Sequence, residues 1–361
     1  TDVFYVPGTG MPSSVWKMDS SATSLFGQMD YQISDNLIAT LGISYSDDSK
    51  DVSGNITIID PFAALPLEAA GLGALSGLQF FKPFNNYPNA SEDGKFDSDD
   101  VTHNLSLSYA VSESISIYAT HSTGFKATSV NMTVDARDVR SADPEEATNI
   151  EIGLKATFDN GYLNIAYFDQ NIDGFQSNAF SGTGFNLVNA GKESHEGVEL
   201  DSMLALSENL MLRVSAMSLD AVYDSFERGT CDTTGLAEPQ YQCPAGQPYI
   251  DLSGLNPAGI HDLSANANIV YSFNVGGSLD GFARLEYVYE ENTNLADLIP
   301  VSIAERGFKN VNASIGFSQD NWSVMFWGRN MTDHETLYSA FPTTAAPGSF
   351  SGYPSAPSTY G

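Results

Sequence analysis

The chain has 361 residues, of which 15 are basic and 45 acidic, so its formal net charge at pH 7 is -30. Nucleic acid is excluded as a partner, because its phosphate backbone would repel so anionic a chain. Hydrophobic residues make up 42% and aromatic residues 11% of the sequence, which argues against intrinsic disorder. No run of about eighteen apolar residues occurs, so the sequence predicts no transmembrane helix.

The N-terminal quarter predicts one hairpin between two loops. Residues 1–20 are rich in Pro and Gly and are predicted to form a loop. Apolar residues alternate with polar or small ones in 25–33 and again in 37–45, the pattern of strands whose two faces meet different surroundings. A long loop is predicted for 46–100, with a short helix at 62–78.

The alternation continues through the middle of the chain. It covers 101–111 and 115–123 and is clearest in 148–158 and 162–169, which are joined by Asp159-Asn160-Gly161. An Asn-Gly pair supplies the positive φ angles that a two-residue hairpin turn requires. In the first strand of this pair one face carries Ile150, Ile152, Leu154 and Ala156, and the other Asn149, Glu151, Gly153 and Lys155.

Three more hairpins are predicted toward the C-terminus, at 197–220, 263–289 and 311–329. The total is six hairpins and about twelve strands, with short turns at one end and long loops at the other. A soluble sandwich would need no such asymmetry, because its apolar face is buried on a second sheet. The predicted fold is therefore all-β, an antiparallel up-and-down transmembrane β-barrel with an apolar face toward lipid and a polar face toward the lumen.

Only two cysteines occur, Cys231 and Cys243, and both lie in one long polar loop. In an oxidising compartment they are expected to form a disulfide, although two free thiols are the alternative.

Several aromatic residues and one arginine in the predicted loops are candidate ligand contacts, because binding sites are concave and largely apolar. They are Phe125, Arg140, Phe180, Phe185, Tyr223 and Phe226. The aromatic side chains are equally suited to pack loop on loop, and the sequence leaves both interpretations open.

Polar residues on the strands are interpreted as structural rather than as a transport path, since every such barrel has a polar lumen. They are Asn149, Glu151, Lys155, Glu199, Asp201, Arg213, Arg284 and Glu286. Two acidic groups are candidate Ca²⁺ sites, because Ca²⁺ is bound by carboxylate oxygens. One group is Asp47, Asp48 and Asp51, and the other is Glu92, Asp93, Asp97, Asp99 and Asp100. They lack EF-hand spacing, so a solvated loop face is the preferred interpretation, with divalent bridging to lipopolysaccharide as a further hypothesis. No other metal site is predicted.

The sequence predicts no enzyme. None of the five histidines lies in an HExxH motif, and no GxSxG motif occurs. His121 next to Ser122 does not make a catalytic pair, because adjacent residues of a strand face opposite ways.

Several segments, in the same order, resemble TonB-dependent outer-membrane receptors. They are 122–127 (STGFKA) with 144–155 (PEEATNIEIGLK), 189–191 (NAG) with 197–200 (GVEL), and 327–333 (WGRNMTD). The resemblance implies a twenty-two-stranded barrel with an N-terminal plug and a TonB box. Such receptors import siderophores, haem, cobalamin or saccharides in Gram-negative bacteria, driven by the inner-membrane TonB complex.

This chain departs from the family pattern, because it has no recognisable plug or TonB box and it ends at 358–361, where the family's last strand begins. We therefore expect residues 1–361 to be one domain, the C-terminal part of the barrel, corresponding to about strands ten to twenty-one. Further sequence is expected to complete the wall, since unpaired strand edges in lipid are costly. The expected function is TonB-dependent active uptake of a scarce ligand, with the long loops extracellular; the alternative is a passive porin or a surface-exposed barrel scaffold or adhesin. Expected partners are the TonB complex, the plug, the remaining barrel half, and outer-membrane lipid with lipopolysaccharide.

Overall fold

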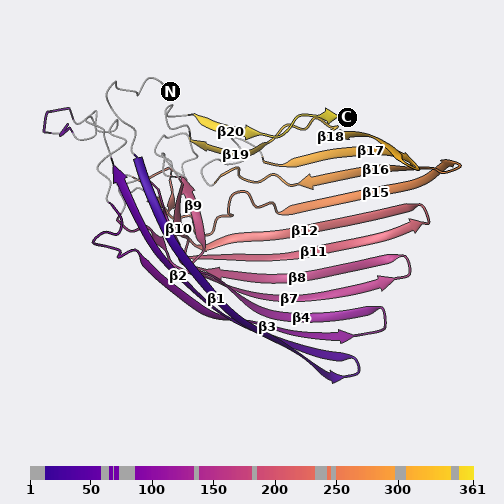
Figure 1. Cartoon of the computed structure of the whole chain (residues 1–361), viewed down its shortest axis with the longest axis horizontal. Coiled ribbons are helices and arrows are strands. Elements are labelled where there is room, and N and C mark those ends of the chain that lie inside the picture. Colours follow the sequence, from indigo (N-terminus) through magenta and orange to yellow (C-terminus); the bar gives the residue numbers. More distant parts are fainter. Residues whose placement is uncertain are drawn as a thin grey trace.

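The computed structural model describes residues 13–57, 65–67, 69–72, 86–133, 138–180, 185–231, 242–244, 249–296, 306–342 and 349–361. Within them the chain is all-β, and one antiparallel sheet of thirteen strands dominates (Figure 1). No helix in the described part of the chain is long and apolar enough to cross a membrane.

The large sheet consists of consecutive hairpins laid side by side. Its order is β1 (Ser13–Ser34), β2 (Leu37–Thr57), β3 (Lys95–Ala110), β4 (Ile115–Lys126), β7 (Glu145–Phe158), β8 (Gly161–Asp173), β11 (Lys192–Ser207), β12 (Leu210–Ser225), β15 (Leu263–Gly276), β16 (Leu279–Glu290), β17 (Phe308–Gln319), β18 (Trp322–Arg329) and β21 (Thr359–Tyr360). The six predicted hairpins are all present. The thirteenth strand, β21, is held against β18 by two residue pairs.

The hairpins have short turns at one end, on the right of Figure 1, which we call the turn end. At the opposite loop end, four small sheets are formed by the pairs β5 (Ser129–Val130) with β6 (Ser141–Ala142), β9 (Gln176–Phe180) with β10 (Phe185–Asn189), β13 (Gly229–Thr230) with β14 (Tyr249–Ile250), and β19 (Leu337–Pro342) with β20 (Phe350–Pro354). The predicted asymmetry between the two ends is confirmed.

Three strand boundaries predicted from the sequence are wrong. The first strand begins at Ser13, inside the predicted N-terminal loop, and β2 and β3 run well into the predicted loop 46–100. The sequence misses these boundaries because the segments are rich in Ser and Asp, which have low strand propensity. In the structure they nevertheless continue the strand pairing of the neighbouring apolar segments. The predicted helix at 62–78 lies mostly outside the described residues.

The side chains alternate between two faces, as the sequence predicts. We call the side that carries Ile150 and Ile152 the apolar face, and the side that carries Asn149 and Glu151 the polar face. Ile150 and Ile152 are 49% and 57% exposed, so this face has no protein layer over it among the described residues. Apolar side chains left bare in this way suit a hydrocarbon solvent.

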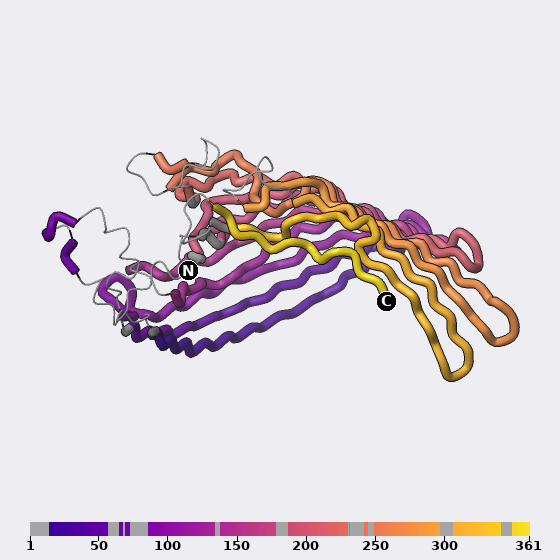
Figure 2. Tube along the Cα trace, turned by 90° about the horizontal axis from the view of Figure 1, so that it is seen from above, coloured from indigo at the N-terminus to yellow at the C-terminus, as the bar shows by residue number. Residues whose placement is uncertain are grey.

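The sheet is curved (Figure 2). Among the described residues, β1 pairs only with β2, and β21 pairs only with β18. Within the described residues the sheet therefore has two edge strands, β1 and β21.

The disulfide between Cys231 and Cys243 is present, as predicted. Cys231 belongs to a buried cluster at the loop end with Ala190, Tyr223, Phe226, Ile250 and Leu252. This cluster is the largest compact core of the described loops, and it packs Ile250 of β14 with Tyr223 of β12 and with Ala190, which lies between β10 and β11.

Candidate functional site

The polar face of the sheet carries the charged residues that the sequence assigns to a lumen. Glu151, Glu199, Asp201, Arg213, Arg284 and Glu286 all line cavities on this face. Arg284 pairs with Glu286 at 3.0 Å, and Asn312 donates to the same carboxylate at 3.0 Å. Asn268, with its amide turned to satisfy both partners, accepts from the Arg284 guanidinium at 2.7 and 2.9 Å. Arg284 and Glu286 therefore neutralise each other.

A cavity of about 460 Å³ lies on the polar face toward the loop end. Strands β4, β7, β8, β11 and β12 form its floor. Its lining includes Ser122, Gly124, Asn149, Glu151, Phe168, Gln170, His195, Glu199 and Met217. The volume is within the range of small-molecule sites, which is about 300–1,000 Å³.

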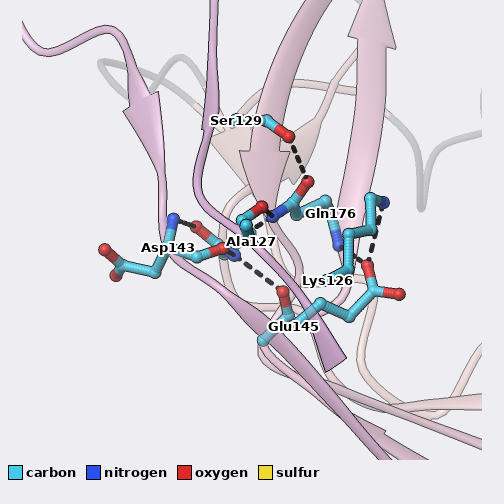
Figure 3. A network of polar contacts seen from close by, with 8 residues as sticks. Lys126, Ala127, Ser129, Asp143, Glu145 and Gln176 are labelled. Atoms are coloured by element: carbon cyan, nitrogen blue, oxygen red, sulfur yellow. Dashed lines mark hydrogen bonds and ion pairs between the residues drawn. The ribbon is translucent and has the colours of Figure 1, made fainter. Parts of the chain in front are cut away.

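The rim beside this cavity is fixed by the side chain of Gln176 (Figure 3). Its amide donates to the carbonyl oxygens of Asp143 at 2.8 Å and Ala127 at 3.2 Å, and its Oε1 accepts from Ser129 Oγ at 2.8 Å. Its backbone N–H donates to Glu145 Oε2 at 2.9 Å. Gln176 is 95% buried (5% exposed) and ties β4, β7 and β9 into one rim.

A second set of contacts joins the β2–β3 loop to the β4–β7 loop through Glu92. Its carboxylate accepts from Tyr87 Oη at 2.9 Å, from the Arg140 N–H at 2.7 Å, and from the Ser141 N–H at 3.1 Å and Oγ at 2.5 Å. Burial acts to raise the pKa of Glu92, but these hydrogen bonds outweigh it and hold the pKa below its ordinary value. For Tyr87, burial and the Glu92 carboxylate both raise the pKa of the phenol.

Arg140 is fully buried within this second set. Its Nη1 donates to the carbonyl oxygen of Thr133 at 2.9 Å, and its guanidinium carbon lies 5.1 Å from the ring centre of Trp16 on β1. The guanidinium therefore supports the loops, and a ligand would reach it only after they rearrange.

The other predicted ligand contacts do not gather in one place. Tyr223 and Phe226 pack edge to face at 5.0 Å inside the buried cluster that includes Cys231, so they pack loop on loop. Phe125 is the cross-strand partner of Glu146 and lies on the same face as Ile150, away from the cavity. Phe180 and Phe185 are partners in the β9–β10 ladder, and their side chains lie outside the described residues. Ligand contact by these residues remains a prediction.

The acidic residues on β2 and β3 that the sequence offers as Ca²⁺ candidates point to both faces of the sheet, because alternate residues of a strand face opposite ways. Asp47 and Asp51 on β2 and Asp97 and Asp99 on β3 continue the apolar face beyond its last aromatic residues, whereas Asp48 and Asp100 point to the polar face. Asp48 pairs with Lys50. Within the described residues, no group of three His, Cys, Asp or Glu side chains is arranged to hold a metal ion.

Five polar residues that line or flank the cavity were not singled out together from the sequence: Asn104, Ser122, Asn149, Gln170 and His195. Of these, only Asn149 is among the lumen-facing polar residues that the sequence predicts. The missing signal was register, because the alternation reveals faces but not which residues of different hairpins are level with one another.

A family model for the TonB-dependent receptor-like β-barrel matches residues 1–331. The chain belongs to the TonB-dependent receptor family. Receptors of this family are outer-membrane β-barrels of Gram-negative bacteria, and they are transporters and receptors rather than enzymes. A search of curated proteins gives no match.

Solved structures of such receptors share the fold. The ferric yersiniabactin uptake receptor FyuA from Yersinia pestis has a TM-score of 0.73 and 14% identity, with 99% of this chain and 47% of that one covered. The siderophore receptor PiuA from Acinetobacter baumannii has a TM-score of 0.64 and 15% identity, covering 96% and 43%. The copper transporter OprC has a TM-score of 0.61 and 13% identity, covering 95% and 48%. The chain spans about half of the length of these receptors, whose identities are low enough to inform on fold alone.

Proposed function

We propose that the chain forms part of the wall of an outer-membrane transporter that takes up a scarce ligand by TonB-dependent active transport. The proposed ligand is a siderophore, haem, cobalamin or a saccharide. The observation that carries the proposal is the continuous polar face, hollowed by cavities and lined by residues from successive hairpins of a TonB-dependent receptor barrel.

The proposal includes further parts of the protein. A strand order with two ends would leave unpaired backbone groups in lipid, so additional strands are expected to complete the barrel. In this proposal residues 1–361 are the C-terminal part of the barrel domain, and a plug that contacts the TonB complex fills the lumen. Carboxylates on the polar face, such as Glu199, are suited to pair with basic groups of that plug. The loop end is taken as extracellular, and no catalytic role is assigned to the chain.

We further propose that divalent cations link the protein to lipopolysaccharide. The carboxylates beyond the apolar band are the supporting feature, because Asp169, Glu196 and Asp220 are direct neighbours across β8, β11 and β12 on the apolar side. Carboxylate oxygens are the ligands that Ca²⁺ prefers. Anionic lipid phosphates would be repelled by such a row unless a cation lay between them.

The test of transport is uptake by cells that carry the full-length receptor, with and without a functional TonB. Labelled ferric siderophore, haem, cyanocobalamin and linear glucose tetrasaccharides serve as probes. Saturable, TonB-dependent accumulation of one probe is the expected result. Non-saturable entry that is indifferent to TonB would overturn the proposal in favour of a passive porin.

A further inference from the structure

Five polar side chains form a straight row across five adjacent strands of the polar face. Direct cross-strand partners link Asn104 to Ser122, Ser122 to Asn149, Asn149 to Gln170 and Gln170 to His195. The strands are β3, β4, β7, β8 and β11, which lie side by side in Figure 1. Since neighbouring strands are about 4.8 Å apart, the row is about 19 Å long.

The side chains of this row differ from other polar groups on the same face. One step nearer the turn end, Thr120 bonds to Ser106 at 3.1 Å, and Tyr118 bonds to Glu151 at 2.5 Å. By contrast, the side chains of Asn104, Ser122, Asn149 and Gln170 have no hydrogen-bond partner among the residues that the structure describes. Their donors and acceptors are thus not used within the described part of the wall.

His195, at the end of the row, is held in a fixed orientation. Its Nε2 lies 2.7 Å from Oε1 of Glu193, which is buried to 1% exposure. A carboxylate only accepts hydrogen bonds, so Nε2 donates to Glu193 and Nδ1 is left for another partner. Glu193 therefore acts as a positioning residue for the imidazole, in the way that a carboxylate fixes a histidine beside a metal.

The chemistry of the row indicates the class of ligand. Amides and a hydroxyl both donate and accept hydrogen bonds. The lining of the cavity contains no Lys or Arg, and it carries the carboxylates of Glu151 and Glu199, so it disfavours an anion. Phe168, Met217 and Leu219 add apolar surface to the same lining. A pyranose has this combination of hydroxyl groups and an apolar ring face, and its length is similar to the spacing of the strands.

We propose that this row is a binding track for a neutral linear oligosaccharide, with about one sugar unit to each strand. The inference rests on the proposed transport function and selects one of its ligand classes. It assigns direct ligand contact to Asn149, Gln170 and His195, three residues from successive strands that meet in one cavity.

The test uses the full-length receptor, titrated calorimetrically with glucose tetrasaccharides of α-1,4 and β-1,4 linkage. Asn149→Ala and Gln170→Ala are each expected to weaken binding of the favoured tetrasaccharide about three- to tenfold, the usual effect of losing one or two hydrogen bonds. Asn209→Ala is the control, because Asn209 lies in the exposed turn between β11 and β12, outside the lining of the polar-face cavities. Its affinity is expected to equal that of the wild type.

Glu193→Gln tests the positioning role. It is expected to weaken binding in the wild-type background and to have no further effect in a His195→Ala background. A merely structural role of Glu193 would lower affinity equally in both backgrounds.

Two binding results would overturn the track, and two further results named below would do the same. One is the absence of tetrasaccharide binding to the wild type at millimolar concentration; the other is unchanged affinity in both Asn149→Ala and Gln170→Ala. If Asn149→Ala instead exposes the plug to trypsin while sugar affinity stays constant, the row contacts the plug and the inference is wrong. TonB-dependent uptake of a ferric siderophore without sugar binding would refute the track alone, whereas TonB-independent entry of every probe would refute the proposed function.

Discussion

Asp47 on β2 and Asp99 on β3 are direct cross-strand partners on the same face of the sheet. Like charges in this relationship repel, at a cost of about 0.2–1 kcal/mol relative to a neutral pair. Asp19 and Asp51 stand in the same relationship one strand along. A protein that retains several such pairs is expected to gain stability when cations occupy the space between them.

The first prediction concerns Asp99→Asn. In lipid with a chelator, this variant is expected to raise the free energy of unfolding by about 0.2–1 kcal/mol, and the difference should disappear in millimolar Ca²⁺. Thermal unfolding in the two buffers measures it. Asp100→Asn, on the opposite face, is the control; wild-type stability that does not respond to chelator would count against cation bridging.

A second prediction concerns Glu92 and pH. Because the folded-state pKa of Glu92 is lowered, its hydrogen bonds contribute stability above the unfolded pKa of about 4.3, and that stability is lost as the pH falls through the folded pKa. Glu92→Gln is expected to lower the free energy of unfolding at pH 7 by about 1–3 kcal/mol, with a smaller difference at pH 3. Unfolding curves at both values measure the change, with the exposed Glu113→Gln as control. An equal difference at both pH values would show that the ionised carboxylate is not what matters.

The third prediction concerns Gln176→Ala. The substitution removes three side-chain hydrogen bonds from a buried site and leaves the carbonyl oxygens of Ala127 and Asp143 without this donor. The rim is expected to lose about 1–3 kcal/mol of local stability. Hydrogen exchange in 126–131 and 141–145 should accelerate, while Gln28→Ala on β1 should leave these segments unchanged. Unaltered exchange would mean that the backbone pairing alone fixes the rim.

A fourth prediction concerns the Cys231–Cys243 disulfide, which joins residues 12 apart in sequence. Closing a loop of this length stabilises the folded state by about 3 kcal/mol in the chain-entropy model. Replacing both cysteines by serine is expected to increase proteolysis near Tyr223 and Ile250, the neighbours of Cys231 in its cluster. Strand β7, remote from the loop, serves as the internal reference. Equal proteolysis of both regions in the variant would indicate global destabilisation.

The sequence predicts the sheet well because one physical constraint acts on every strand. Each must place alternate residues in two different surroundings, and Asn160-Gly161 and similar turns separate one strand from the next. The ends of the strands are harder to predict, because the Asp- and Ser-rich extensions of β2 and β3 depend on pairing with each other rather than on their own propensity.

The candidate site is predicted less well. The alternation assigns Asn149 to the polar face, and the turn at Asn160-Gly161 could place Gln170 level with it, because both residues lie in the β7–β8 hairpin. The pairing of Gln170 with His195 joins two hairpins, so no turn in the sequence reveals it. The roles of the loop aromatic residues are also not predicted by the sequence. Whether Phe226 meets a ligand or Leu252 depends on how the loops fold over one another, and no local pattern encodes that.

The β7–β8 ladder runs without a bulge from Glu146–Asp173 to Phe158–Gly161. Such a ladder constrains how the gene can change length. Deleting one codon within the strand would move every residue beyond it to the opposite face, exchanging Ile152 with a polar neighbour. Insertions and deletions in these strands are therefore tolerated in even numbers, whereas the loops accept any number, and length variation among natural variants should show this parity.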